Sequence, residues 1–222
     1  MTQSTWSAVD ELIQTVVRPD TVLDQALARA EAAGLPAIQV SAAQGRMLQI
    51  LAQVHGARRI LEIGTLGGYS TIWMARGLVG DEPRLTTLEI DPVHAAVAEE
   101  NITRAGLAGV VDILVGRAVD TLGRLIQDGV EPYDMVFVDA DKPSNVAYLE
   151  AALQLTRRGS VIVVDNVVRA GLVVDPGSTD PAVTGTRALY ARVAGDDRLA
   201  ATVVQTVGSK GYDGFMLIRV AA

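Results

Sequence analysis

The sequence predicts an α/β protein with a mostly parallel, seven-stranded sheet that ends in an antiparallel hairpin. From residue 59 onward, short β-branched runs alternate with amphipathic stretches of roughly 10–15 residues. Crossovers of this length join parallel strands and place helices on both faces of a sheet. The last two runs are separated only by the turn Gly208-Ser209-Lys210-Gly211, which is short enough for an antiparallel pair alone.

Three helices are expected before the first strand. Apolar side chains recur at helical spacing from Trp6 to Val17. A second helix is predicted over Thr21–Ala33, because Gly34 and Pro36 follow it. The third begins at Ser41, where Gln44 completes a capping-box pattern, and it ends near Gly56.

Beyond residue 58, the spacing of apolar residues alternates between the two-residue period of strands and the 3.6-residue period of helices. The predicted elements follow from this alternation. The predicted strands are Arg59–Ile63, Arg84–Ile90, Val110–Val115, Asp134–Val138, Gly159–Val164, Ala201–Val207 and Gly214–Val220. The predicted helices are Gly68–Leu78, Pro92–Ala105, Ala118–Gln127, Asn145–Thr156 and Ala182–Val193.

Local signals mark several boundaries and the domain organisation. Asp91 before Pro92 favours a helix start, and Gly106 and Gly159 favour helix ends. The Gly, Asp and Pro-rich segment Val167–Pro181 is predicted to be a long loop, of a kind that is often functional. No linker or repeat is evident. We therefore expect one domain over residues 1–222, with an N-terminal helical extension over residues 1–57.

Composition narrows the classes of function. A net charge of -7 and a pI near 4.8 argue against a broad nucleic-acid-binding surface. No apolar run reaches the roughly 20 residues that span a bilayer, and no signal peptide is evident. Cys is absent and only two His are present, which argues against disulfides and a zinc enzyme. We expect a cytoplasmic protein without membrane or nucleic-acid partners.

Charged side chains follow two buried-looking strands. The run Met135–Val138 leads into Asp139-Ala140-Asp141-Lys142, and the run Val161–Val164 leads into Asp165-Asn166. Ligands bind α/β sheets at the carboxyl ends of their strands. Carboxylate and amide oxygens suit a hard divalent cation, with Mg²⁺ favoured and Mn²⁺ or Ca²⁺ as alternatives. The adjacent lysine suggests a proton-abstraction site beside the cation.

A glycine-rich turn follows the first predicted strand. A dinucleotide site requires G-x-G-x-x-G, but Leu66 stands at the second glycine position after Gly64. Glu62 would repel a pyrophosphate and tolerate a cationic ligand. Glu89, at the end of the second strand, can accept both hydroxyls of a ribose. With Ser70 these residues describe a nucleoside site without a phosphate, which fits S-adenosylmethionine.

The chain resembles a known family through three blocks in order. Leu61–Thr65 with Gly68-Tyr69-Ser70, then Asp139-Ala140-Asp141-Lys142, then Asp165-Asn166, are similar to the cation-dependent O-methyltransferases. These include catechol O-methyltransferase, the caffeoyl-CoA O-methyltransferases and small bacterial relatives. The resemblance runs from about Val40 to Arg219 and implies the Rossmann-like class I methyltransferase fold. It also implies a homodimer.

The resemblance assigns roles residue by residue. The implied S-adenosylmethionine contacts are Val40, Glu62, Gly64, Thr65, Ser70, Glu89, Ala118 and Asp141. The implied metal ligands are Asp139, Asp165 and Asn166. Lys142 matches the lysine proposed as general base, and Asp139 also matches a position that contacts the substrate. Ala170 stands where plant relatives carry a substrate-contacting Asn, which argues against a hydroxycinnamoyl-CoA acceptor.

The predicted function is S-adenosylmethionine-dependent, divalent-metal-dependent methylation of a hydroxyl. The expected acceptor is a small catechol-like or polyphenolic molecule. A tRNA hydroxyuridine O-methyltransferase of the same fold is an alternative, although the acidic balance weakens it. An NAD-dependent reductase and a non-catalytic nucleoside-binding module are alternatives from other classes.

Overall fold

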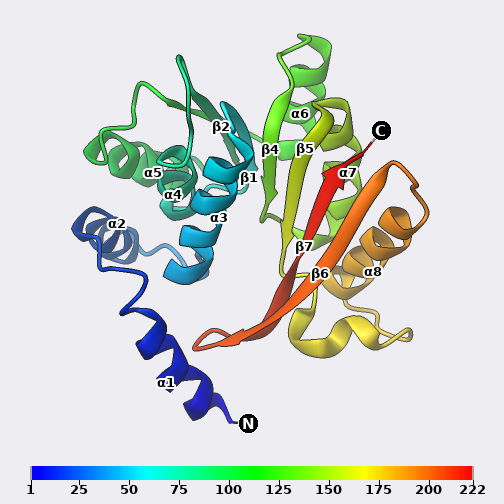
Figure 1. Cartoon of the computed structure of the whole chain (residues 1–222), viewed down its shortest axis with the longest axis horizontal. Helices are drawn as coiled ribbons and strands as arrows, with labels where there is room; N and C mark the ends of the chain where they lie inside the picture. The colour runs from blue at the N-terminus through cyan, green and yellow to red at the C-terminus, as the bar shows by residue number, and fades with distance from the viewer. Residues whose placement is uncertain (1, 222) are drawn as a thin grey trace. The chain divides into compact units, whose positions relative to one another are not determined.

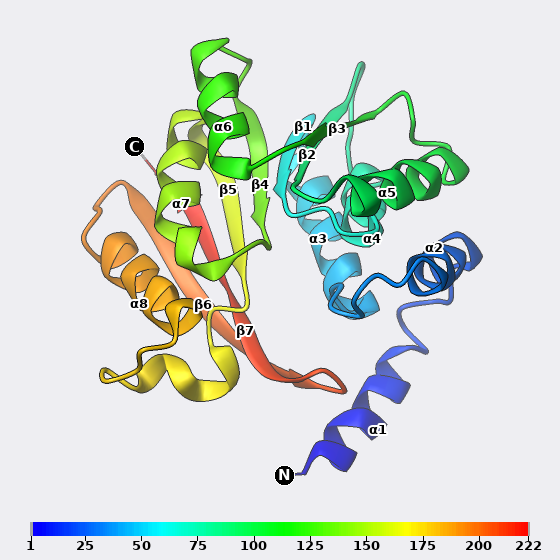
Figure 2. The ribbon, with the colours of Figure 1, turned by 180° about the vertical axis from the view of Figure 1, so that it is seen from behind.

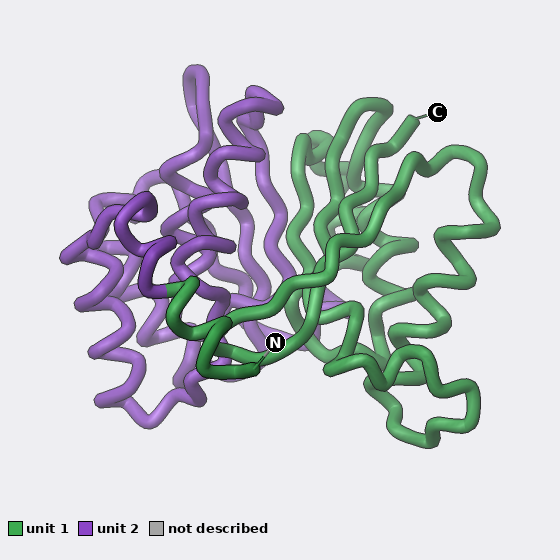
Figure 3. Tube along the Cα trace, turned by 60° about the horizontal axis from the view of Figure 1, so that its bottom comes forward, with its two compact units in different colours: residues 1–10, 122–222 green, residues 11–121 purple. Residues whose placement is uncertain are grey.

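The computed structural model describes residues 2–221, which form two compact units (Figure 3). One unit comprises residues 11–121 and is called the N-terminal unit below. The other comprises residues 1–10 and 122–222 and is called the C-terminal unit. The expected single domain over residues 1–222 stays a prediction.

The N-terminal unit carries three parallel strands in the order β3-β2-β1, of which β1 and β2 are labelled in Figure 1. The largest side chains of its core, including Leu61, Ile72 and Trp73, are buried almost completely. Its strands are β1 (Arg59–Ile63), β2 (Arg84–Glu89) and β3 (Val111–Val115). Its helices are α2 (Thr21–Ala32), α3 (Ala42–His55), α4 (Tyr69–Ala75) and α5 (Pro92–Arg104), and α6 (Ala118–Gln127) begins in this unit.

The C-terminal unit carries four strands in the order β4-β5-β7-β6. β4 and β5 are parallel, whereas β7 is antiparallel to both β5 and β6. Helices α7 and α8 lie side by side against one face of these strands (Figure 2). The strands are β4 (Tyr133–Val138), β5 (Thr156–Asp165), β6 (Leu199–Gly208) and β7 (Gly211–Val220). The helices are η1 (Lys142–Ser144), α7 (Asn145–Gln154), η2 (Arg169–Val174) and α8 (Pro181–Ala194).

These seven strands confirm the predicted mostly parallel sheet with an antiparallel C-terminal hairpin. Local capping signals are confirmed as well. The Ser41 hydroxyl accepts a hydrogen bond from the Gln44 amide at 3.2 Å, and the Asp91 carboxylate accepts one from the Val93 amide at 2.7 Å. Gly56 ends α3 in the left-handed conformation. Within residues 2–221, no helix combines the length and apolar character that crossing a membrane requires.

Gly159 corrects one sequence prediction. We expected it to end a helix and begin a strand, but α7 ends at Gln154 and β5 begins at Thr156. Gly159 lies inside β5 at φ 99°, in the stretch of β5 where the register with β4 shifts. Such a shift is a β-bulge, and the missing side chain of glycine lets the backbone adopt the left-handed φ that it needs.

The first helix, α1 (Gln3–Ile13), is shorter than the apolar repeat suggested. It buries none of its residues, and Val9 and Leu12 remain 50% and 68% exposed. Its first residues belong to the C-terminal unit, where Gln3 and Asp10 bond to the turn between β6 and β7. Because α1 has no buried face, these polar contacts determine its position.

Candidate active site

Glu62 is the centre of a buried polar network in the N-terminal unit. Its side chain is completely buried at the end of β1. One carboxylate oxygen accepts a hydrogen bond from the Ser70 hydroxyl at 2.5 Å. The other accepts from the hydroxyls of Thr71 at 2.5 Å and Thr87 at 2.7 Å. A buried carboxylate requires such donors, so Glu62 ties the start of α4 and the middle of β2 to β1.

Glu89 organises the glycine-rich turn. Its carboxylate, at the end of β2, accepts hydrogen bonds from the amides of Thr65 at 3.2 Å and Leu66 at 2.7 Å. Leu66 adopts φ 50°, a conformation that side chains other than glycine rarely adopt. Gly64 has φ 101°. Glu89 therefore holds a turn whose backbone is strained, at the edge of the strands where a nucleoside was expected.

The structure brings five of the predicted cofactor residues together around this turn: Glu62, Gly64, Thr65, Ser70 and Glu89. Val40 is buried before α3, and Ala118 is half-buried at the first residue of α6. Sequence reasoning missed Thr71 and Thr87, which complete the shell around Glu62. Threonines in a helix and a strand carry no signal that they face a carboxylate from another strand.

The predicted metal ligands lie in the C-terminal unit, at the ends of β4 and β5. The register pairs Val138 with Val164, so the next residues, Asp139 and Asp165, leave neighbouring parallel strands side by side. Asp165 is 5% exposed, and its carboxylate accepts a hydrogen bond from the Asn166 amide at 2.9 Å. Asn166 has φ 56°, which turns the chain sharply after the strand. The sequence prediction that these three side chains gather is consistent with this register.

Lys142 is buried beside the carboxylate of Asp139. Its ammonium donates to the Asp139 carboxylate at 2.9 Å, and the residue is 7% exposed. Helix α8 packs closely on its backbone, because a Cβ at Gly185 would lie 2.4 Å from the Lys142 carbonyl oxygen. Only glycine permits this approach. The lysine predicted as general base is thus held against a predicted metal ligand.

Asp141 is engaged differently from Asp139. One oxygen of its carboxylate accepts a hydrogen bond from the Ser144 amide at 3.2 Å, and the other accepts from the Tyr148 hydroxyl. Burial alone would raise the pKa of Asp141, but these hydrogen bonds outweigh it and hold that pKa below its usual value. Tyr148 is buried in α7, and its hydroxyl orients Asp141.

Removing this hydroxyl tests the role of Tyr148. In Tyr148→Phe, the pKa of Asp141 should move back toward its ordinary value. A carboxyl whose folded-state pKa is depressed contributes stability above its unfolded-state pKa, and loses it as pH falls through the folded-state pKa. We therefore expect a loss of about 1 kcal/mol at neutral pH, because the carboxylate is partly exposed. Urea unfolding at neutral pH and at pH 3 should show this loss shrinking in acid; a loss independent of pH would contradict it.

The loop after Asn166 is fixed by Asp213 of β7. One oxygen of that carboxylate accepts hydrogen bonds from the amides of Val168 and Arg169, each at 3.0 Å. Arg169 and Ala170 adopt φ 57° and φ 55°, so two successive residues after the predicted metal ligands are left-handed. The predicted long loop is confirmed, with η2 inside it. Sequence reasoning missed Asp213, which lies 47 positions after Asn166.

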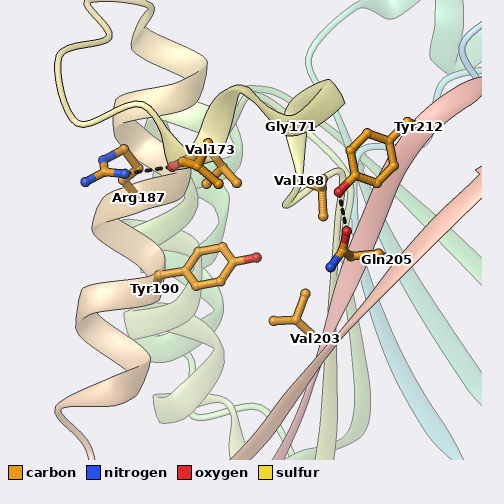
Figure 4. Close-up of a pocket in the computed structure, with 9 residues that line it drawn as sticks. Val168, Gly171, Val173, Arg187, Tyr190, Val203, Gln205 and Tyr212 are labelled. Atoms are coloured by element: carbon orange, nitrogen blue, oxygen red, sulfur yellow. Dashed lines mark hydrogen bonds between the residues drawn. The ribbon is translucent and has the colours of Figure 1, made fainter.

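A pocket of about 470 Å³ opens beside this loop (Figure 4). Four valines line it, together with two tyrosines, a glycine, a glutamine and an arginine. Tyr190 of α8 points across the pocket toward Val203 of β6, and the Tyr212 hydroxyl bonds to Gln205 (Figure 4). The lining residues are Val168, Gly171, Val173, Val174, Arg187, Tyr190, Val203, Gln205 and Tyr212.

The α/β fold carries a nucleoside-type glycine turn in one unit and paired acids at the ends of two strands in the other. These features are typical of a class of group-transfer enzymes. Comparison with known proteins gives the family. The model of the O-methyltransferase family matches residues 14–220. The chain belongs to that family and is an O-methyltransferase, as predicted, rather than a reductase or a non-catalytic binding module.

Individual relatives are similar along their whole length. A catechol O-methyltransferase of Niastella koreensis is 49% identical, covering 99% of this chain and 100% of the relative. A catechol O-methyltransferase of Mycobacterium tuberculosis is 51% identical, covering 94% and 93%. The crystal structure of an O-methyltransferase from Bacillus cereus in complex with SAH has a TM-score of 0.97 at 50% identity, covering 99% and 100%. This similarity confirms the predicted class I methyltransferase fold.

Proposed function

We propose that this O-methyltransferase transfers the methyl group of S-adenosylmethionine to a hydroxyl of a small catechol-like acceptor, with the help of a divalent cation. The observation that carries the proposal is the register of β4 and β5, which sets Asp139 beside Asp165 with Asn166 next along the chain. Two relatives that are about half identical to this chain are named catechol O-methyltransferases, which supports the acceptor class.

The N-terminal unit supplies a setting that suits the cofactor. The Bacillus cereus relative was solved with SAH, the demethylated product of S-adenosylmethionine. The turn held by Glu89 lacks the glycine pattern of a pyrophosphate site, and its carboxylates favour a sulfonium cation over a phosphate. The buried Glu62 network would keep this turn in place. Contacts of Val40, Ala118 and Asp141 with the cofactor stay predictions.

The donors at the ends of β4 and β5 fit a hard cation. Among residues 2–221, no three Asp, Glu, His or Cys side chains gather as a metal site, so a cation would depend on Asp139 and Asp165 with the Asn166 amide. This all-oxygen set suits Mg²⁺ best, with Mn²⁺ or Ca²⁺ as alternatives, and excludes a thiolate or imidazole site. When bound, such a cation would orient the acceptor hydroxyl and lower its pKa.

Lys142 is the proposed base. The phenolic hydroxyl of a catechol, with a pKa near 10, is a poor nucleophile at neutral pH. The Lys142 side chain donates a hydrogen bond to the Asp139 carboxylate at 2.9 Å, and in its neutral amine form it would accept the proton of the acceptor hydroxyl. Asp139 would orient the lysine in both states. Burial excludes water from the lysine and keeps the proton transfer local.

The acceptor would be aromatic and small. The pocket beside the loop that follows Asn166 combines valine walls with the hydroxyls of Tyr190 and Tyr212. A few polar groups in an apolar cavity of this size suit a hydroxylated ring. Burial and the nearby Asp213 and Tyr212 raise the pKa of Tyr190, so its hydroxyl remains a hydrogen-bond donor at neutral pH. We place the apolar body of the acceptor in this pocket.

We also propose a cytoplasmic homodimer. Light scattering should then give twice the chain mass of 23.4 kDa, whereas the mass of a single chain would contradict the dimer.

The acceptor class is tested by formation of S-adenosylhomocysteine from S-adenosylmethionine and Mg²⁺. Catechol should be methylated, and phenol, which lacks the second hydroxyl, should stay at background because it cannot occupy two positions on one cation. The same assay with a tRNA that carries 5-hydroxyuridine tests the alternative acceptor. Equal rates with phenol and catechol, or methylation of the tRNA alone, would overturn the proposed acceptor.

A further inference from the structure

One charged side chain, that of Arg187, stands among the described residues that line the pocket beside the loop after Asn166. The other described lining residues are valines, tyrosines, a glycine and a glutamine, all of which are uncharged. A few polar groups placed in an apolar pocket fix the orientation of a ligand and give the site its specificity. Arg187 is therefore the group in this lining that can select a ligand by its charge.

The guanidinium of Arg187 is held in place but its charge is not balanced. One of its terminal nitrogens donates to the Val173 carbonyl oxygen at 2.7 Å (Figure 4). That oxygen is neutral, and within residues 2–221 no carboxylate forms an ion pair with Arg187. A guanidinium has five N–H donors, so a single carbonyl oxygen leaves most of them for a ligand.

The acidic residues of the neighbouring loop and strand are engaged elsewhere. Asp213 of β7 accepts hydrogen bonds from three backbone amides and pairs with the Arg169 guanidinium at 3.9 Å. Asp175, directly after η2, is exposed and accepts a hydrogen bond from an amide of its own turn at 2.9 Å. Because these carboxylates have other partners, the positive charge of Arg187 remains for a bound anion.

The positions of the lining residues give the pocket a direction. Arg187 and Tyr190 are three positions apart on α8, so their side chains leave the same face of the helix. Figure 4 places these two on one side of the pocket, and Val168 and Tyr212 on the other. Val168 is the second residue after Asn166, a proposed metal ligand. The charged side of the pocket therefore lies across the cavity from the segment that follows the proposed metal site.

A carboxylate is the anion that suits this side of the pocket. It pairs with a guanidinium through two parallel hydrogen bonds, and the two single charges cancel. A phosphate monoester carries a charge of about -1.5 to -2 at neutral pH, so one guanidinium would leave part of it unbalanced among apolar walls. The pocket volume of about 470 Å³ falls within the range of about 300–1,000 Å³ that holds drug-sized ligands, so a ring with a short side chain has room.

We propose that Arg187 binds a carboxylate of the acceptor, and that the enzyme prefers catechol acids whose carboxylate lies at the opposite end from the two hydroxyls. This inference rests on the proposed function and narrows its acceptor class. Arg187 acts in acceptor binding and orientation, on the side of the ring away from methyl transfer.

Dihydrocaffeate and its neutral amide test this preference. The two compounds have the same shape, and a saturated chain separates their end groups from the catechol ring. Wild-type kcat/KM should favour the acid about tenfold, which is the expected effect of one charge-assisted pair. Arg187→Met should reduce this ratio to below about twofold through loss of rate with the acid alone. Arg187→Lys, which keeps the charge without the planar fork, should retain a ratio of about threefold.

Two controls isolate the role of Arg187. Arg158 is exposed near the start of β5 and is not among the described residues that line the pocket. Arg158→Met loses the same charge and should keep the tenfold preference. The isomer of dihydrocaffeate that carries its chain next to the diol places the carboxylate on the wrong side of the pocket. Its rate should be the same in wild type and Arg187→Met, and a tenfold loss would contradict the proposed orientation.

Calorimetry gives a readout that does not depend on methyl transfer. With S-adenosylhomocysteine and Mg²⁺ present, dihydrocaffeate should bind Arg187→Met about tenfold more weakly than wild type, and the amide should bind both equally. Equal melting temperatures of the variants show that they fold.

The outcomes separate this inference from the proposed function. If wild type methylates and binds the acid and the amide equally, or if the preference survives in Arg187→Met, the role of Arg187 is overturned alone. If the acid binds through Arg187 but no catechol is methylated, the proposed function is overturned and the carboxylate site stands. If wild type binds neither compound, both are overturned.

Discussion

Asp165→Ala is expected to lower kcat/KM for catechol methylation about 10³-fold, which corresponds to about 4 kcal/mol of transition-state stabilisation. Asp165 is one of the two carboxylates among the proposed donors, and it is buried at the end of β5. Its loss would leave a cation with Asp139 and an amide only. The remaining donors cannot orient the acceptor hydroxyl or hold its charge. Initial rates at saturating Mg²⁺ measure this effect.

A matched control separates catalysis from folding. Asp134 is also a buried carboxylate, at the other end of β4, where it pairs with Arg157. Asp134→Asn should reduce stability yet leave kcat/KM within about threefold of wild type. If folded Asp165→Ala retains more than a tenth of the wild-type kcat/KM, Asp165 is not a ligand of a catalytic cation.

Glu62→Ala is expected to reduce the free energy of unfolding by about 3–5 kcal/mol. The substitution removes the acceptor of three hydroxyls, those of Ser70, Thr71 and Thr87, in a site that water does not reach. Buried donors left without a partner cost about 1–3 kcal/mol each, and part of this is regained by local rearrangement. Urea unfolding followed by circular dichroism measures the change.

The exposed Glu100→Ala is the control for that measurement. Glu100 pairs with Arg104 on the surface of α5 and is 53% exposed. Surface ion pairs contribute little, so this variant should change the free energy of unfolding by less than about 0.5 kcal/mol. A loss below about 1 kcal/mol in Glu62→Ala would show that Glu62 does not organise the N-terminal unit.

The sheet could be predicted because its determinants are local. Buried parallel strands appear as continuous apolar runs, as in Met135–Val138, and caps such as Asp91 mark where helices begin. The bulge at Gly159 could not be predicted, because a glycine near the end of a helical pattern indicates a helix end equally well. Only the pairing of β4 with β5 distinguishes the two.

The site was predictable to the extent that strand ends determine it. Asp139, Asp165 and Asn166 follow apolar strands directly, so their gathering needs only the parallel order of the sheet. The supporting residues depend on contacts between distant segments. Tyr148 of α7 bonds to Asp141, and Asp213 of β7 bonds to the amides of Val168 and Arg169. The periodicity of apolar residues in the sequence does not indicate contacts between distant segments.

Dependence on a divalent cation is the central claim, and chelation tests it most directly. Catechol methylation should be measured before EDTA treatment, after exhaustive EDTA and gel filtration, and after Mg²⁺ is restored. We predict that chelation reduces the rate to background, that Mg²⁺ restores it in wild type, and that it fails to do so in Asp165→Ala. A chelated wild-type protein that methylates catechol at its original rate would contradict the metal-dependent mechanism.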